Sequence, residues 1–444
     1  MPGAADTDVD VDVDADVDVV VVGAGLVGAA CALRLAAAGR EVVLLDAQAP
    51  GQGASFGNAG HIATEQIFPL ASAEVIRASW RYLLAADSPL RLRAAYLLPL
   101  LPWLTRFVWA ARPAAFARGV AALMALQQTA LGDLAELMAH ASIGGLLHHD
   151  GYLRVWETAA GEAAARAQAS RLQAFGVHCA PAEMDLLRRA APGLSTRIAG
   201  AIQYPDTAHV DDPLAVCQGF VGALQRAGGS VRQQRVRAVQ PGRHGSVTLQ
   251  LEPGKTLQLE PGKTLRCRQV LLCAGAWSRP LLAGLGHAVP LDTERGYHIT
   301  VPWPDADGTP AALLRPLQVP VASTERNVIM TPMAMGLRMT GTVEFGGMSL
   351  APDPRRYALL RQQLAALLPG SSSANATSWM GFRPSLPDHL PVLGRSPLHQ
   401  NVFFAFGHQH LGLTLCAVTA RLMADLMQGH APQLDLSAYR VDRF

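Results

Sequence analysis

A run of valines that ends in a glycine-rich turn constrains the fold of this chain more than any other feature. Residues 19–28 read VVVVGAGLVG, and an Ala- and Leu-rich stretch without a helix breaker follows up to Gly39. A second apolar run, residues 42–45, ends in Asp46. This order predicts a strand, a tight turn, a helix and a second strand that carries an acid at its end.

The turn has the spacing of a dinucleotide-binding site. In such a turn the first glycine permits the bend, the second lets the backbone approach a pyrophosphate, and the third lets the helix lie close to the strand. The helix N-terminus offers free N–H groups and a positive dipole end to the phosphates. Asp46 is placed to hold the ribose hydroxyls of an adenosine, and an acid there favours FAD or NAD over NADP. A glycine turn in an ordinary βαβ unit is the alternative. The predicted ligand residues of this segment are Gly23, Gly25, Leu26, Val27, Gly28 and Asp46.

The composition is typical of a globular α/β enzyme. The chain has 444 residues, enough for two domains, with 50% hydrophobic and 16% charged residues. The formal net charge is +2, and no basic and aromatic patch is dense enough to predict nucleic-acid binding. The six cysteines are scattered without a CxxC pair, so we expect buried thiols in a reducing cytoplasm. No pair of ligand motifs predicts a metal site.

Two segments have unusual compositions. Residues 1–16 alternate between Asp and Val and lack the features of a signal peptide, so we expect a disordered acidic tail. The most apolar stretch, residues 94–111, is interrupted by Pro99, Pro102 and Arg106 and is therefore not predicted to span a membrane. We consider two interpretations of this stretch: buried helices, or a surface that docks peripherally on the inner face of the cytoplasmic membrane or on a partner subunit.

A second glycine-bounded turn lies near the C-terminus. The apolar run 402–406 ends at residues 407–412, and a helix is predicted over 414–427. Two strand–turn–helix units at opposite ends of the chain predict an α/β fold with a Rossmann-like cofactor-binding domain built from both chain ends. An α+β substrate domain with an antiparallel sheet is inserted between them. We place the cofactor domain at residues 17–80, 195–285 and 379–444, and the substrate domain at 81–194 and 286–378.

Several short segments, taken in order, resemble the superfamily of FAD-dependent D-amino acid oxidases and dehydrogenases, the DAO family, which also includes glycine and sarcosine oxidases. ASFGNAG is most similar to bacterial D-amino acid dehydrogenases. The longer run ASFGNAGHIATEQIFPLAS, with RGYH and GHQHLGLT, is most similar to the branch that oxidises hydroxy-D-proline. The segments that carry the resemblance are the first glycine turn with Asp46, ASFGNAGH at 54–61, LLCAGAWS at 271–278, RGY at 295–297, GTVE at 341–344, GFRP at 381–384, PVLG at 391–394 and GHQHLGLT at 407–414.

This resemblance implies an extended FAD in the first domain. The loop 54–61 would reach the pyrophosphate and the flavin, Ala274 and Gly275 would pass the ADP portion, and the turn at 407–414 would face the flavin pyrimidine carbonyl. Val236 matches a position whose backbone meets adenine, although a core valine would look the same. The resemblance adds to the predicted FAD site Ala54, Ser55, Asn58, Ala59, Gly60, His61, Val236, Ala274, Gly275, Trp277, Gly381, Gly407, His408, Gln409, His410, Leu411, Gly412, Leu413 and Thr414.

The resemblance also implies four residues for catalysis and substrate binding. Arg383 corresponds to an arginine that binds the substrate carboxylate, for which a guanidinium fork is well suited; a structural salt bridge to a residue such as Asp388 is the alternative. Tyr297 would add a hydrogen bond or simply pack in the core. His410 stands where some relatives have arginine, and would touch the substrate or its 4-hydroxyl group, or bond to the backbone. His61 would face the flavin.

We therefore expect an FAD-dependent dehydrogenase that oxidises the Cα–N bond of a D-amino acid. The favoured substrate is cis-4-hydroxy-D-proline, converted to a pyrroline carboxylate by hydride transfer to flavin N5, with electrons passing to a quinone or another carrier. A glycine- or sarcosine-type oxidase that uses O₂ is the second enzyme hypothesis. A flavoprotein subunit of a multi-subunit amino acid dehydrogenase is the third hypothesis.

Overall fold

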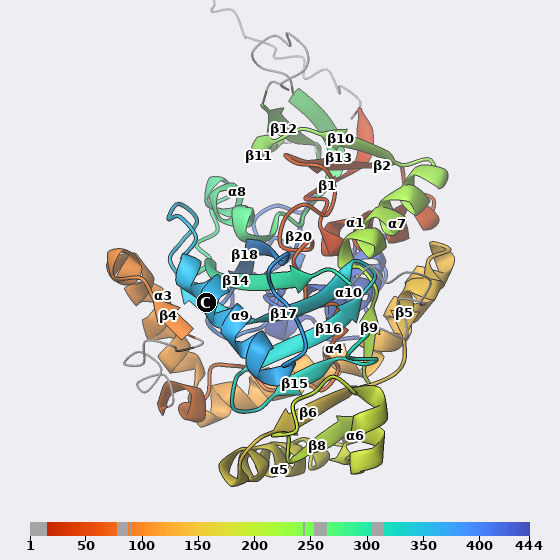
Figure 1. The fold of residues 1–444 in the computed structure, drawn as a ribbon. Helices are drawn as coiled ribbons and strands as arrows, with labels where there is room; N and C mark the ends of the chain where they lie inside the picture. Colours follow the sequence, from red (N-terminus) through yellow and green to blue (C-terminus); the bar gives the residue numbers. More distant parts are fainter. Residues whose placement is uncertain (1–15, 78–87, 89, 243–244, 253–263, 304–314) are drawn as a thin grey trace, which may run out of the picture.

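Two large sheets organise the chain in this computed structural model (Figure 1). The structure describes residues 16–77, 88, 90–242, 245–252, 264–303 and 315–444. The predicted acidic tail therefore lies outside the described residues, except for Asp16.

The first sheet has eight strands within the described residues, and its central strands are parallel. Its order is β10-β2-β1-β13-β12-β11, with β20 on β13 and β19 on β20. The run of valines forms β1, where β-branched side chains pack well on both faces of a buried strand. The strands are β1 (Val17–Val22), β2 (Val42–Asp46), β10 (Ser230–Gln233), β11 (Val236–Pro241), β12 (Val247–Leu251), β13 (Thr264–Leu272), β19 (Val392–Arg395) and β20 (Val402–Phe406).

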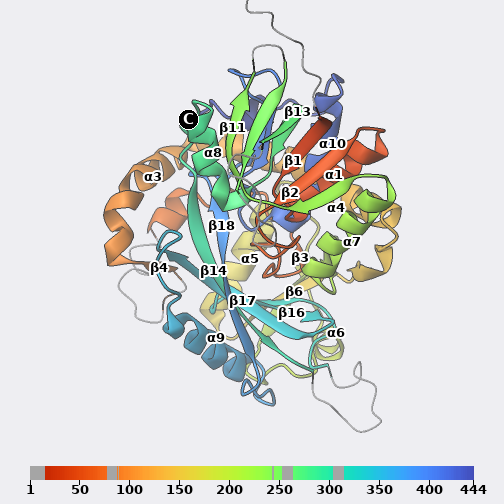
Figure 2. The ribbon, with the colours of Figure 1, turned by 90° about the horizontal axis from the view of Figure 1, so that it is seen from above.

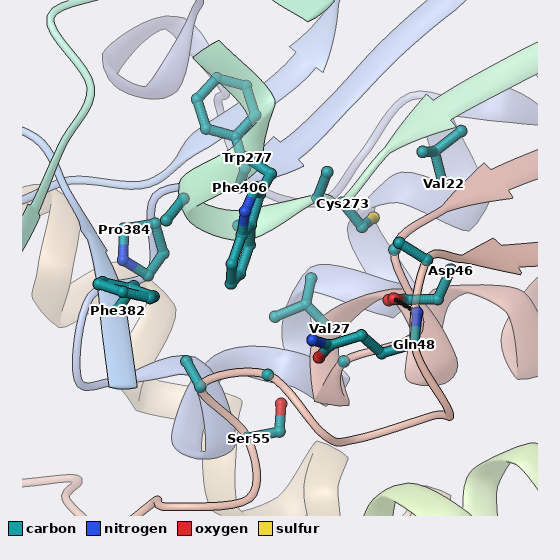
Figure 3. A pocket seen from close by; sticks show the side chains of 18 of the residues that line it. Val22, Val27, Asp46, Gln48, Ser55, Cys273, Trp277, Phe382, Pro384 and Phe406 are labelled. Atoms are coloured by element: carbon teal, nitrogen blue, oxygen red, sulfur yellow. Dashed lines mark hydrogen bonds between the residues drawn. The ribbon is translucent and has the colours of Figure 1, made fainter. Parts of the chain in front are cut away.

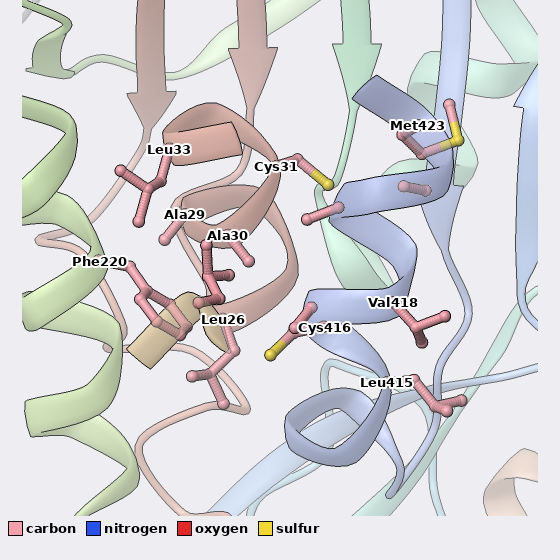
Figure 4. Close-up of a cluster of buried hydrophobic side chains, with 14 of the residues drawn as sticks. Leu26, Ala29, Ala30, Cys31, Leu33, Phe220, Leu415, Cys416, Val418 and Met423 are labelled. Atoms are coloured by element: carbon pink, nitrogen blue, oxygen red, sulfur yellow. The ribbon is translucent and has the colours of Figure 1, made fainter. Parts of the chain in front are cut away.

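Helices from both ends of the chain cover one face of this sheet. Helix α1 (Leu26–Ala37) lies between α7 (Pro213–Arg226) and α10 (Gly412–Met427), as Figure 4 shows. Small residues such as Ala29 and Ala30 let α1 approach its neighbours closely. The strand pairing of both chain ends in one sheet agrees with the predicted Rossmann-like domain.

The second sheet has nine strands in the described part of the chain, and most of its pairs are antiparallel. Its order is β18-β14-β17-β16-β15-β6-β8-β7, with β4 on β17. Helix α9 (Pro354–Leu367) packs on β14 and β17 (Figure 2). The strands are β4 (Leu90–Leu92), β6 (Tyr152–Trp156), β7 (Ala180–Pro181), β8 (Gly200–Tyr204), β14 (Asp292–Val301), β15 (Val321–Ser323), β16 (Val328–Met333), β17 (Gly336–Phe345) and β18 (Thr377–Ser385).

A small third sheet and several further helices complete the fold. A small sheet joins β3 (His61–Ile62), β9 (Ala208–Val210) and β5 (Leu147–His148). The remaining elements used below are α3 (Leu97–Ala110), α4 (Pro113–His140), α5 (Ala159–Gln173), α6 (Met184–Ala190), the short helix η3 (Gly275–Trp277) and α8 (Ser278–Gly284).

The domain boundaries in the structure differ from the predicted ones in three places. Strand β8, predicted to lie in the cofactor domain, pairs with β6 of the second sheet. Strand β18 pairs with β14, so residues 379–385 also belong to the second sheet. Helix α4, predicted to lie in the substrate domain, packs on α10 and contributes to the core of the first domain. In each case the partner of the element lies far away in the sequence, so the local pattern does not identify it.

Candidate cofactor and substrate site

The glycine turn between β1 and α1 is built by close backbone contacts. Gly23 has a φ of +108°, and a Cβ atom there would lie 2.4 Å from the carbonyl oxygen of Cys273. A Cβ atom on Gly28 would lie 1.8 Å from the carbonyl oxygen of Gly23. Gly28 therefore allows α1 to pack against the turn, as the motif predicts.

A cavity of about 470 Å³ opens at this turn (Figure 3). Asp46 and Gln48 lie at one end, Phe382 and Pro384 lie at the other, and Ser55 lies between them. The fold thus brings together segments that are far apart in the sequence. The predicted cofactor residues that line the cavity are Gly23, Gly25, Leu26, Val27, Asp46, Ala54, Ser55, Asn58, Val236, Ala274, Gly275, Trp277, Gly407, His408, Gln409, Gly412 and Leu413.

The other predicted cofactor residues do not line the cavity. Gly381 lies under the ring of Trp379, because a Cβ atom there would be 1.9 Å from that ring. The Thr414 hydroxyl accepts a hydrogen bond from the Ala63 amide at 3.0 Å. The residues that do not line the cavity are Gly28, Ala59, Gly60, His61, Gly381, His410, Leu411 and Thr414.

The end of the cavity at Asp46 is polar. The Asp46 carboxylate accepts hydrogen bonds from the amides of Ala24 at 2.7 Å and Gln48 at 2.8 Å, and burial raises its pKa. Each carboxylate oxygen keeps the capacity to accept another hydrogen bond. Sequence reasoning missed the other polar residues at this end. Gln48 lies just after β2, whereas the others reach the cavity through the pairing of β10, β11 and β12; these are Gln234, Arg235, Arg237 and Glu252.

Two helices begin at the cavity, and in neither does the N-cap residue use its own side chain as a cap. The first turn of α1 follows Gly25 and that of α10 follows Leu411, and neither turn contains an acid. The Leu26 amide donates a hydrogen bond to the Ser55 hydroxyl at 3.0 Å. The remaining N–H groups and the positive ends of both helix dipoles favour a ligand that carries negative charge.

Arg383 lies in β18, between two residues that line the cavity, Phe382 and Pro384. Its side chain therefore points to the other face of the strand, where the guanidinium is near His298 and His410. The Arg383 guanidinium lies over Gly296 of β14, where a Cβ atom would be 2.6 Å from the guanidinium carbon. Among the described residues this guanidinium has no hydrogen-bond or ion-pair partner, and the Arg383 side chain is half-buried. A half-buried cation of this kind is suited to binding a carboxylate.

The alternative of a salt bridge between Arg383 and Asp388 is wrong. Asp388 pairs instead with Arg443, whose Nε lies 2.7 Å from a carboxylate oxygen and whose Nη2 lies 3.1 Å from the other. The Asp388 carboxylate thus already has a bidentate partner from the C-terminal residues.

Three buried or half-buried polar groups surround Arg383. Glu294 accepts a hydrogen bond from the Ser385 hydroxyl at 2.6 Å. His298 contacts the carbonyl oxygen of Gly57 at 3.2 Å, and His410 is hydrogen-bonded to the Gln66 side chain. Burial lowers the pKa of His298 to about 3 and that of His410 to about 4, and the charge of Arg383 contributes to both. Both imidazoles are therefore neutral near neutral pH.

Tyr297 and His61 do not line the cavity. The Tyr297 side chain is fully buried, and its hydroxyl donates to Glu344 at 3.3 Å and accepts from the Asp353 amide at 3.1 Å. In this structure the hydrogen bonds of the Tyr297 hydroxyl are therefore made within the protein core. His61 lies 3.3 Å from Glu65 and meets the ring of Tyr152 edge-on.

Arg338 of β17 connects the second sheet to the predicted flavin loop. Its guanidinium donates to the carbonyl oxygens of Phe56 at 3.0 Å and Asn58 at 2.8 Å. Burial lowers its pKa to about 10. Sequence reasoning missed this residue, because no local pattern around it shows that β17 passes beside residues 56–58.

Comparison with known proteins identifies the family. Residues 18–426 match the DAO family, described as FAD dependent oxidoreductase. The chain belongs to this family. It is 29% identical to the D-amino-acid oxidase of Bradyrhizobium diazoefficiens, over 95% of this chain and 97% of that protein. It is 30% identical to D-amino acid dehydrogenase 2 of Ralstonia nicotianae, over 95% of this chain and 99% of that protein.

Solved structures of DAO-like flavoenzymes share the fold. A glycine oxidase from Geobacillus kaustophilus superposes with a TM-score of 0.68 at 20% identity, and the match covers 96% of this chain and 98% of that one. An L-proline dehydrogenase from P. horikoshii gives a TM-score of 0.70 at 16% identity, covering 97% and 98%. The predicted α/β fold of the DAO family is therefore confirmed.

The cavity of this DAO-family protein fits FAD. Asp46 would hold the adenosine ribose, the start of α1 would face the pyrophosphate, and the start of α10 would face the flavin. At Gly275 no described atom lies within 4 Å of a built Cβ, so the space beside it is open. FAD supplies an acceptor for two electrons. The protein is an FAD-dependent oxidoreductase, as the sequence predicts.

The buried neutral histidines predict that this enzyme loses stability in acid. Burial lowers the pKa of His298 and His408 to about 3, whereas an unfolded histidine titrates near 6.5. Between about pH 3 and pH 6.5 the unfolded state therefore binds more protons than the folded state. The free energy of unfolding that is present above about pH 6.5 decreases as the pH falls through this range. At about pH 5 each histidine is expected to cost about 2 kcal/mol relative to neutral pH.

Thermal unfolding of the FAD-loaded protein at several pH values measures this loss. His408→Gln should flatten the dependence of Tm on pH, because its ring is 5% exposed and bonded only to the Thr419 hydroxyl at 2.9 Å among the described residues. His430→Gln, at an exposed position, serves as the matched control and should leave the slope unchanged. Equal slopes for all three proteins would contradict the prediction.

Proposed function

We propose that this enzyme oxidises the Cα–N bond of a D-amino acid and passes the electrons to a quinone or another carrier. The observation that carries the proposal is the Arg383 guanidinium, which is free of described protein partners and belongs to a strand that lines the FAD cavity. Two parallel hydrogen bonds from a guanidinium to the substrate carboxylate fix both the position and the orientation of Cα. The D-amino acid oxidase and dehydrogenase named above support the handedness.

In the proposed reaction the amine enters uncharged. FAD held by Asp46 and by the starts of α1 and α10 would accept the hydrogen of Cα together with two electrons. The nitrogen lone pair would form the C=N bond, and the proton on nitrogen would be released. No obligatory protein base is required, so the chain contributes mainly orientation and electrostatics. From a hydroxy-D-proline the product is a pyrroline carboxylate. From a primary D-amino acid the imine hydrolyses to a 2-keto acid and ammonia.

We further propose cis-4-hydroxy-D-proline as the favoured substrate. This narrower proposal is supported by the resemblance of ASFGNAGHIATEQIFPLAS, RGYH and GHQHLGLT to the hydroxyproline-oxidising branch. It is also supported by the neutral His410, bonded to Gln66 and close to Arg383. Imidazole and amide groups can exchange hydrogen bonds with a hydroxyl group without adding charge.

Anaerobic bleaching of the flavin tests the reaction and the substrate together. The purified protein is mixed in parallel with cis-4-hydroxy-D-proline, D-proline, D-alanine, sarcosine and glycine, and the visible flavin absorption is followed. Fastest bleaching with the two D-prolines is the expected result. Faster bleaching with sarcosine or glycine would replace the proposal with a glycine- or sarcosine-type oxidase, and formation of peroxide in air would identify O₂ as the acceptor. A yellow protein that none of them bleaches would favour a subunit of a larger dehydrogenase.

A further inference from the structure

Helix α3 exposes an apolar face at the outer edge of the molecule (Figures 1 and 2). Its exposed side chains include Leu98 at 78%, Trp109 at 57% and Val108 at 55% exposure, together with Leu97 and Leu101. Single exposed leucines are common on protein surfaces. Five large apolar side chains on one helix form a patch of the kind that marks an interaction site.

The exposed residues share one side of the helix. At 100° per residue, these five side chains fall within about a third of the circumference. The opposite side faces the protein, where Trp103 is buried against Phe345 with ring centroids 5.2 Å apart. The Trp103 indole also donates to the carbonyl oxygen of Ser385 at 3.4 Å, so α3 is attached to the end of β18. Because the inner side of α3 is packed against the protein in this way, the apolar patch on its other side faces solvent.

The surroundings of the patch are basic. Residues 90–132 contain no aspartate or glutamate and five arginines. Arg106, Arg112 and Arg118 are exposed, and the Arg112 guanidinium lies 4.6 Å from the centre of the Trp109 ring. Apolar and aromatic residues flanked by arginines are typical of helices that lie in the headgroup region of an anionic bilayer.

A membrane-spanning role does not fit the same region. No single helix in the described ranges is long and apolar enough to cross a membrane. Residues 94–110 and 113–140 pass the length and composition test only as a pair, with a bend of 88° between them. The apolar residues of α4, such as Leu126 and Leu134, are buried in the core of the first domain. Of these two helices, α3 is therefore the one whose apolar residues are available to a lipid surface.

We propose that α3 docks this enzyme on membranes that contain anionic phospholipids. Leu98, Val108 and Trp109 enter the boundary between headgroups and acyl chains, and Arg106 and Arg112 meet the phosphates. A second copy of the chain is a poorer occupant, because a symmetric contact through this face would bring the exposed Arg106 and Arg112 of both copies together. Because Trp103 attaches α3 to β18, docking through α3 would also hold the site near an electron acceptor dissolved in the lipid. This last point alone rests on the proposed function.

Vesicle flotation of the FAD-loaded protein tests the docking. Vesicles of phosphatidylcholine alone are compared with vesicles that also contain phosphatidylglycerol, each at low and high salt. The protein is expected to float with the anionic vesicles and to dissociate as salt screens the arginines. The double variant Leu98→Glu/Trp109→Glu is expected to lower the bound fraction about tenfold or more. Leu398→Glu is the matched control, because Leu398 is 58% exposed and lies outside α3.

FAD content and substrate bleaching are measured on every variant and should not change, because the altered residues lie outside the cavity. Failure of the parent protein to float, or equal flotation of the parent and the double variant, would overturn the docking proposal. A dimer that the double variant abolishes, without lipid binding by the parent, would assign the face to a second copy. Since flotation requires no turnover, these outcomes are independent of whether the proposed reaction is correct.

Discussion

Arg383→Ala is expected to lower kcat/KM for the best substrate by about 10²–10⁴-fold, mainly through KM, with FAD content unchanged. The variant removes two charge-assisted hydrogen bonds to the substrate carboxylate, each expected to contribute about 1.5–3 kcal/mol. Arg383→Lys should recover part of the affinity, since an ammonium keeps the charge but loses the planar fork. Anaerobic flavin titration gives the substrate affinity, and the visible absorption per chain gives the FAD content.

Arg443→Ala is the control for the general effect of losing a half-buried arginine near β18. Arg443 pairs with Asp388 and donates to the carbonyl oxygen of Leu390 at 2.7 Å, away from the cavity lining. This variant should lower Tm and leave KM close to that of the parent. If Arg383→Ala kept the KM of the parent, or if both variants raised KM equally, Arg383 would not be the carboxylate ligand.

Gly28→Ala is expected to abolish FAD binding and to destabilise the first domain by more than about 3 kcal/mol. The added methyl group would lie 1.8 Å from the Gly23 carbonyl oxygen and 3.2 Å from the Cys273 Cβ atom. The nearest of these atoms is backbone, which can move away only if the turn opens or α1 shifts from β1. The measurements are FAD content after purification and the Tm of the variant in the presence of added FAD.

Gly132→Ala makes the same substitution in another helix. Gly132 is exposed in α4, and no described atom lies within 4 Å of a built Cβ. There the substitution should stabilise the protein by about 0.5–1 kcal/mol, because alanine is the better helix former. A Gly28→Ala protein that retained yellow colour and the parent Tm would show that the close approach of α1 to the turn is not required.

The local features of the cofactor site could be predicted because they depend on neighbouring residues. The turn at Gly23 and the acid at Asp46 lie within one strand–helix–strand unit, whose spacing follows from the chain itself. The second glycine turn before α10 indicated in the same way that the C-terminus returns to the first sheet.

The surroundings of Arg383 could be predicted only in part, because they depend on which face of β14 lies toward Arg383. The sequence RGYH predicts a strand segment but does not say which alternate residues face the site. Tyr297 points to the side covered by α9, where it meets Tyr357 with ring centroids 5.2 Å apart. His298, one residue later, points to the opposite side and stacks on Trp379. The resemblance indicates Tyr297 as a substrate-binding candidate, and the sequence alone does not show that His298 lies on the side of β14 that faces Arg383.

The Arg338 contacts connect the loop at residues 56–58 to both sheets. The loop follows β2 of the first sheet, yet its carbonyl groups are held by a cation on β17 of the second. Opening the loop would leave that buried cation without these two acceptors, which is costly in a low-dielectric interior. Since Asn58 also lines the cavity, we expect FAD binding to stabilise the second sheet as well as the first, which would appear as a rise in Tm for both.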